Sequence, residues 1–248
     1  MENPWFWVIA GVAVLVGVVL QRISGMGTGL VVAPTLAALF GGAIGVLMSN
    51  VTAIVSAALI LWAVRERVNW RRGWTIVAWA IPGAVLGAVM VALVPPAWLT
   101  VFVGAVVLLA LGSTYMRPNL PEVHSPALTA AAGTVGGFFN TAAGQAAPAL
   151  IIYARFTRWA QREFAATLQL VFLGMNILSV GFKSVALGFS ELPPLWVLPA
   201  VAAIVLVAVW IGGGLEKRVS TAGARRLATV LAFGGAVLAI VRGVVGLL

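Results

Sequence analysis

Two polar, glycine-rich segments interrupt the apolar stretches of this chain, and they hold many of its groups that could bind a ligand. The first covers residues 21–29 and the second residues 136–145, and each is followed by a proline, Pro34 and Pro148. In a membrane protein, non-helical backbone at bilayer depth survives only where it is buried in protein or lines a cavity. Paired interruptions in corresponding parts of two halves indicate the substrate site of a transporter. We therefore predict that the two segments form the functional centre.

The groups in both segments suit an anion. Hydroxyls and bare backbone N–H groups stand at the start of a half-helix, where the helix dipole also favours negative charge. Arg22 has no acid nearby in the sequence, so backbone carbonyls, a polar partner or an anionic substrate must satisfy its guanidinium. Two alternatives stay open: Arg22 snorkels to the surface, and the small residues serve only close helix packing. The candidates are Arg22, Ser24, Gly25, Gly27, Thr28 and Gly29 in the first segment, and Asn140, Thr141, Gly144 and Gln145 in the second.

Polar stripes on two apolar stretches supply further candidates. One face of the stretch 164–187 carries Gln169, Asn176, Ser179 and Lys183, and the stretch 43–62 carries Ser49, Thr52 and Ser56, with Asn50 beside them. Such residues line a substrate path or, equally, hydrogen-bond between membrane helices with no role in transport. Lys183 stands near one end of its stretch, where a lysine can also snorkel. The candidates added from these stretches are Asn50, Thr52, Thr167 and Gln169.

The composition indicates a membrane protein and argues against an enzyme. Of the residues, 62% are hydrophobic and only 8% are charged. A soluble domain of 248 residues could not bury so much apolar surface. The chain's charge of +9 comes largely from arginines in short loops, where they act as orientation signals, so we expect no nucleic-acid partner. Cysteine and aspartate are absent, and the single histidine lies in a loop. No nucleophile–base pair or metal cluster can be assembled, and we expect neither catalysis nor a cofactor.

The charges of the loops predict the topology. Most of the arginines lie in three loops that we expect in the cytoplasm, 65–72, 155–162 and 217–226. The loops expected outside contain no lysine or arginine, and they are 41–43, 95–97 and 188–194. The stretch 127–154 lies between two cytoplasmic loops. As a helix it would measure about 42 Å, whereas two crossings of the hydrocarbon need about 60 Å. It is therefore predicted to be a re-entrant hairpin whose tip is the second polar segment.

The stretch 5–40 is expected to enter and return from the opposite face, although a full span followed by a short one also fits. Each half, 5–116 and 127–247, then has one re-entrant or broken hairpin plus three transmembrane helices, which makes the halves inverted repeats. The predicted fold is an all-α polytopic membrane protein, one domain over 1–248, with both termini outside. The six full spans expected are 43–62, 74–94, 97–116, 164–187, 195–214 and 227–247.

The order and spacing of these motifs resemble the TauE/SafE family of sulfite exporters and related organosulfur-anion transporters. The resemblance rests on the glycine-rich run 24–29 before Pro34, on 136–144 before Pro148, and on the segment 162–167. It implies transport of small sulfur-containing anions such as sulfite, thiosulfate or sulfonates, whereas the residues alone indicate only an anion.

We expect a secondary transporter that binds the anion between the two hairpin tips and moves it across the membrane by alternating access. An anion-selective channel is the main alternative, followed by a transporter of an unrelated small solute. The expected partners are a small anion and the lipid bilayer, and a homo-oligomer is left open. An arginine-rich chain with abundant alanine, valine and glycine is typical of a GC-rich bacterial genome, so we expect the bacterial plasma membrane.

Overall fold

The structure is a computed structural model that describes residues 4–24, 27–113, 122–188, 197–215 and 218–247, and in these residues every regular element is a helix. This confirms the all-α fold. The helices are α1 (Pro4–Ser24), α2 (Ala33–Phe40), α3 (Gly42–Val64), α4 (Trp70–Leu93), α5 (Pro96–Ser113), α6 (Pro126–Ala143), α7 (Ala147–Phe156), α8 (Gln161–Leu187), α9 (Val197–Leu215) and α10 (Thr221–Val245). A π-helical turn, Thr28–Val32, precedes α2, and a 3-10 turn, Arg65–Arg67, follows α3.

Five helices are long and apolar enough to cross a membrane: α1, α3, α4, α8 and α10. Four of them correspond to expected full spans. The other two expected spans, 97–116 and 195–214, correspond to the shorter apolar helices α5 and α9, each of which adjoins residues outside the described part of the chain. The chain is therefore a multi-pass membrane protein.

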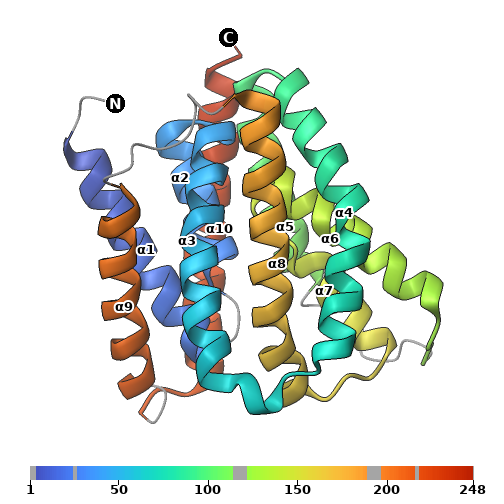
Figure 1. Ribbon diagram of the computed structural model, residues 1–248. Coiled ribbons are helices and arrows are strands. Elements are labelled where there is room, and N and C mark those ends of the chain that lie inside the picture. The colour runs from blue at the N-terminus through green and yellow to red at the C-terminus, as the bar shows by residue number, and fades with distance from the viewer. Residues whose placement is uncertain (1–3, 25–26, 114–121, 189–196, 216–217, 248) are drawn as a thin grey trace.

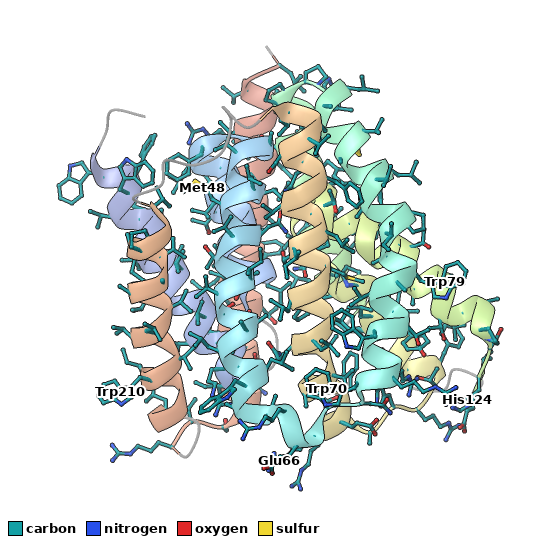
Figure 2. The ribbon with its side chains drawn as sticks, viewed as in Figure 1. Met48, Glu66, Trp70, Trp79, His124 and Trp210 are labelled. Atoms are coloured by element: carbon teal, nitrogen blue, oxygen red, sulfur yellow. The ribbon has the colours of Figure 1, made fainter. Side chains whose placement is uncertain are left out.

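Large apolar side chains cover the outer surface of the bundle. Figure 2 shows the Trp210 and Trp79 side chains pointing away from the helices, and Trp210 is 80% exposed. Exposed valines, leucines and a phenylalanine continue this surface along α10. A soluble protein rarely exposes so extended an apolar surface, because water solvates it poorly. This surface suits contact with lipid.

The two ends of the bundle differ in charge. The turn Arg65–Arg67 and the connection from α7 to α8 lie at one end, at the bottom of Figure 1, which we call the arginine-rich end. The start of α1 and the end of α10 both lie at the opposite end (Figure 1). The two termini of the helical bundle therefore share one side, as the loop charges predict.

Two helical hairpins enter the bundle from opposite ends. In the first, the rings of Trp7 and Phe40 are 5.1 Å apart, so α2 returns to the end where α1 begins. Since α1 has 21 residues and α2 only 8, the first hairpin is a full-length helix followed by a short one. In the second, the N–H of Val123 donates to the carbonyl oxygen of Phe156 (2.9 Å), which brings the start of α6 and the end of α7 together.

The second hairpin thus begins and ends at the arginine-rich end, in agreement with the hairpin predicted over 127–154. The hairpins point toward each other from opposite ends of the bundle. The division into repeats at 5–116 and 127–247, and their relation by inverted symmetry, stay predictions.

Close glycine packing holds the second hairpin against α4. A Cβ atom on Gly83 would overlap the carbonyl oxygen of Thr134, and one on Gly137 would overlap that of Ala80. Small residues let helix backbones approach in this way, and dispersion forces then drive the association in lipid, where no hydrophobic effect assists it. The position of the hairpin tip therefore depends on the contact between α4 and α6.

Candidate substrate site between the hairpin tips

The tips of the two hairpins touch near the middle of the bundle. A Cβ atom on Gly29 would lie 2.8 Å from the carbonyl oxygen of Gly144, so only glycine fits at this contact. Gly144 itself has a φ of 68°, the left-handed conformation that glycine adopts readily, and its N–H donates to the carbonyl oxygen of Asn140. The glycines of the two polar segments thus bring the segments into contact.

A small polar pocket lies between the tips. Its polar lining comes from Gln21, Thr28, Asn140, Gln145 and Asn176. The free volume is about 20 Å³, which accommodates a water molecule but is too small for an oxyanion. The pocket is narrow in this conformation, and a larger ligand can bind only when the residues that line it move apart.

Gln21 organises the first tip. Its Oε1 accepts hydrogen bonds from the backbone N–H of Thr28 (3.2 Å) and from the Thr28 hydroxyl. Its Nε2 donates to Oε1 of Gln169 on α8 (3.1 Å). One glutamine therefore links the end of α1 to the π-helical turn and to the neighbouring membrane helix.

Gln145 forms the second tip, and one of its donors is unpaired. Its Oε1 accepts from the N–H of Ala147 (3.3 Å), which fixes the orientation of the amide. Its Nε2 is buried and has no hydrogen-bond partner in the described structure, and the residue is 3% exposed. A buried donor without a partner costs about 1–3 kcal/mol. Because Gln145 lines the pocket, a ligand with an acceptor atom can remove this cost.

A buried polar network adjoins the pocket and connects α3, α6 and α8. We define it as Asn50, Asn140, Thr141, Asn176, Ser179 and Lys183, none of them more than 3% exposed. Asn140 Nδ2 donates to Ser179 Oγ (2.9 Å) and Asn176 Oδ1 (3.3 Å), and the Thr141 hydroxyl lies 2.8 Å from that of Ser179. Such a network makes the surrounding helices rigid when its members are satisfied.

The far side of the polar network ends in a charged group. Asn50 Nδ2 donates to Asn176 Oδ1 (2.5 Å), and the Lys183 ammonium donates to Asn50 Oδ1 (2.5 Å). Asn176 thereby belongs both to the pocket and to the chain of contacts that leads to Lys183.

The structure brings most of the predicted candidates together. Those that line the pocket are Gly27, Thr28, Gly29, Asn140, Gly144 and Gln145. Those that hydrogen-bond to a lining residue or to the polar network are Asn50, Thr141 and Gln169.

Four other candidates do not line the pocket, and Gly25 lies outside the described residues. Arg22 packs against Gly212 of α9, since a Cβ atom added to Gly212 would lie 2.9 Å from the Cβ atom of Arg22. Ser24 and Thr52 donate to the carbonyl oxygens of Leu20 and Met48 in their own helices. The Thr167 hydroxyl accepts from the N–H of Asn69 (3.0 Å), which attaches the start of α4 to α8.

Three residues absent from the predicted set stand out: Gln21, Asn176 and Lys183. Gln21 belongs to the first polar segment, and the other two to the stripe on 164–187, so the sequence carried a signal for each. Lys183 does not snorkel, because its side chain is fully buried and its ammonium contacts Asn50. That alternative was wrong.

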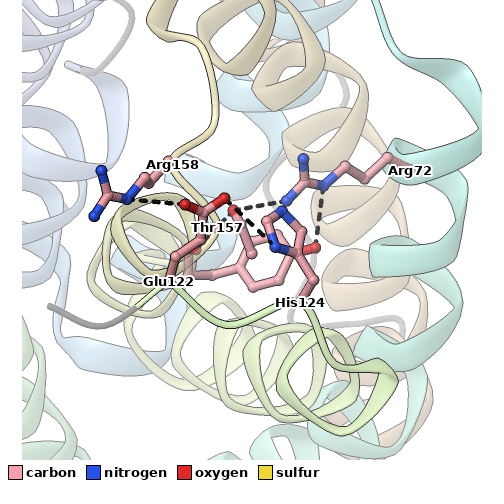
Figure 3. Close-up of polar contacts among 6 residues, drawn as sticks. Arg72, Glu122, His124, Thr157 and Arg158 are labelled. Atoms are coloured by element: carbon pink, nitrogen blue, oxygen red, sulfur yellow. Dashed lines mark hydrogen bonds and ion pairs between the residues drawn. The ribbon is translucent and has the colours of Figure 1, made fainter.

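A separate cluster attaches the second hairpin at the arginine-rich end. Arg72 of α4 donates to the Tyr153 hydroxyl (3.0 Å) and to the Thr157 hydroxyl (2.7 Å), and its guanidinium lies 3.7 Å from the centre of the Trp159 ring. Figure 3 shows the hydrogen bonds of Arg72 beside Glu122, which lies between Arg158 and His124.

Replacing Arg72 by lysine is expected to lower the stability of the protein by about 1–2 kcal/mol, because lysine cannot keep two fixed donors while stacking on an aromatic ring. The change is measured as a fall in melting temperature of the purified protein. Arg71→Lys is the matched control, since Arg71 is exposed at the adjacent position. Equal melting temperatures for the two variants would contradict this role for Arg72.

Taken together, the membrane-length helices and the polar pocket between two broken hairpins define a polytopic membrane protein built as transporters are. The chain belongs to the sulfite exporter TauE/SafE family, whose model matches residues 9–239. This is a family of membrane transporters rather than of enzymes, and the match confirms the resemblance of the motifs. No curated protein and no solved structure matches the chain.

Proposed function

We propose that this protein is a secondary transporter of small sulfur-containing anions, which are held between the two hairpin tips. The observation that carries the proposal is the unpaired Nε2 of Gln145, a buried donor in a pocket that both polar segments line. An oxyanion such as sulfite offers acceptor atoms on every side. It would satisfy this donor and compete with Gln21 for the donors of Thr28.

The positions of the described acids, all away from the pocket, favour an anion over a cation as the ligand. The acids in the described residues are Glu66, Glu122 and Glu163, and all three lie at the arginine-rich end. Glu66 and Glu122 belong to connections between helices, and Glu163 lies in the first turn of α8. None of them lines the pocket. A cation site inside a membrane protein ordinarily uses carboxylates or several convergent carbonyl oxygens. The pocket instead presents side-chain amides and hydroxyls.

The close approach of the two tips supports alternating access over an open channel. With about 20 Å³ between the tips, nothing larger than water fits at the centre. Cavities of about 360 Å³ at the arginine-rich end and about 430 Å³ at the opposite end flank the bundle. A carrier needs such a closed centre, and it opens to one side at a time. The proposed location is the bacterial plasma membrane.

The proposal predicts that a sulfur oxyanion stabilises the purified protein. Only a ligand that prefers the native state raises the melting temperature, and at about 100 times its dissociation constant the gain is about 2.7 kcal/mol, which corresponds to about 5–11 °C. Sulfite, thiosulfate, sulfate and short sulfonates are compared with chloride at equal ionic strength. If no sulfur anion raises the melting temperature more than chloride does, the proposed function is wrong.

A further inference from the structure

Lys183 is a buried ionisable side chain that contacts no carboxylate in the part of the chain that the structure describes. Its side chain is 0% exposed, and its one polar contact in the described structure is Asn50 Oδ1, at 2.5 Å. The described ion pairs all lie at the arginine-rich end, between Glu122 and its neighbours. An ammonium has three donors, and the amide oxygen of Asn50 accepts from only one of them.

Such a residue is costly to retain for packing alone. A buried charge is strongly unfavourable unless it is paired, and a well-packed apolar side chain often serves the fold as well or better. Inside a membrane protein, an ionisable side chain that faces the bundle interior marks a substrate or ion path. Lys183 meets this description, since it faces α3 from α8 through Asn50.

Lys183 is connected to the pocket through Asn50 and Asn176. Asn176, which lines the pocket, is seven residues before Lys183 on the same helix, so the two are about 10 Å apart along α8. Asn50 joins them through its two amide atoms. Lys183 lies toward the end of the bundle opposite the arginine-rich end, because α8 starts at the arginine-rich end and ends four residues after Lys183.

We propose that Lys183 supplies the counter-charge for the transported anion. When the tips separate, the anion takes the place of Asn50 Oδ1 at the Lys183 ammonium and passes along the face of α8 that carries Asn176 and Ser179. This inference rests on the proposed function and names the charged residue of that site. Arg22, the cation expected in this role, packs against Gly212 and does not line the pocket.

Asn50→Asp separates this role from a merely structural one. The new carboxylate would give Lys183 an ion-pair partner at the same position, although it would also remove the Nδ2 donor from which Asn176 Oδ1 accepts. The same carboxylate would occupy the place of the substrate, so anion binding should fall. If Lys183 only ties α8 to α3, the new ion pair in Asn50→Asp maintains its contact with α3, and anion binding stays close to that of the wild type.

The experiment measures the affinity of the purified full-length protein for sulfite and thiosulfate in four variants. Lys183→Met and Asn50→Asp are expected to weaken binding about 10- to 100-fold, while Lys183→Arg keeps much of the affinity. Ser184→Ala is the control, because the buried Ser184 hydroxyl donates only to Val180 in its own helix.

The outcomes distinguish the two claims. Wild-type affinity in Asn50→Asp overturns the role of Lys183 even if Lys183→Met does not fold, and the proposed function then stands. Wild-type protein that binds neither anion, nor any other anion of the screen, overturns the proposed function and this inference with it. Loss of binding in Ser184→Ala to the same extent as in Asn50→Asp also overturns the role, since any change on this part of α8 would then suffice.

Discussion

Replacement of Gln145 by glutamate is expected to weaken anion binding at least about 100-fold, and to lower the stability of the protein because the new charge is buried. The two side chains have nearly the same shape, but the unpaired donor Nε2 becomes part of a negatively charged carboxylate at the pocket. Two like charges about 4 Å apart repel by about 4 kcal/mol at an effective dielectric constant near 20, and a 100-fold loss corresponds to about 2.7 kcal/mol. Titration of sulfite into the purified variant measures the effect.

Gln161→Glu is the matched control for this prediction. Gln161 is the first residue of α8 and is exposed at the arginine-rich end, so the same change of charge occurs far from the tips. Its affinity for sulfite should be close to that of the wild type. If both variants lost affinity equally, the loss would come from the overall charge of the protein and not from the tip.

Gly83→Val should cause the largest loss of stability among the changes considered. Any Cβ at this position would overlap the carbonyl oxygen of Thr134, and valine adds two methyl groups to it. The backbones of α4 and α6 would have to move apart, at a cost of about 3 kcal/mol or more. We expect aggregated protein or a melting temperature lower by several degrees, measured by size-exclusion chromatography and thermal unfolding.

Gly234→Val provides the comparison for this second prediction. Gly234 on α10 is exposed, and a Cβ there would meet nothing within 4 Å. The Gly234→Val variant should fold and elute as the wild type does. Normal elution and thermal unfolding of Gly83→Val would mean that close contact between α4 and α6 does not fix the second hairpin.

The sequence was sufficient to predict the helical membrane fold and the second hairpin, for simple physical reasons. Apolar runs and loop charges determine which segments span and which loops share a side. The length of 127–154 excludes two crossings without any knowledge of packing. The pairing of the two polar segments also predicted that they form one centre, and Gly29 does lie against Gly144.

The roles of individual polar residues were harder to predict, because each depends on a partner distant in sequence. Arg22 seemed the natural cation of the site, yet the rotation of the last turn of α1 places it against Gly212. Thr167 shares a helix with the polar stripe, yet its hydroxyl accepts from Asn69, 98 residues away. Lys183 seemed free to snorkel, and only the position of Asn50 on α3 shows that it is held inside.

The central claim is that an anion crosses the membrane by binding between the two tips. The most direct test is uptake of labelled sulfite into proteoliposomes, measured over a range of concentrations for the wild type and for Gln145→Glu. We predict uptake that saturates in the wild type and falls to the level of empty liposomes in the variant. Uptake that rises linearly with concentration, or that is equal in the two proteins, would contradict the account.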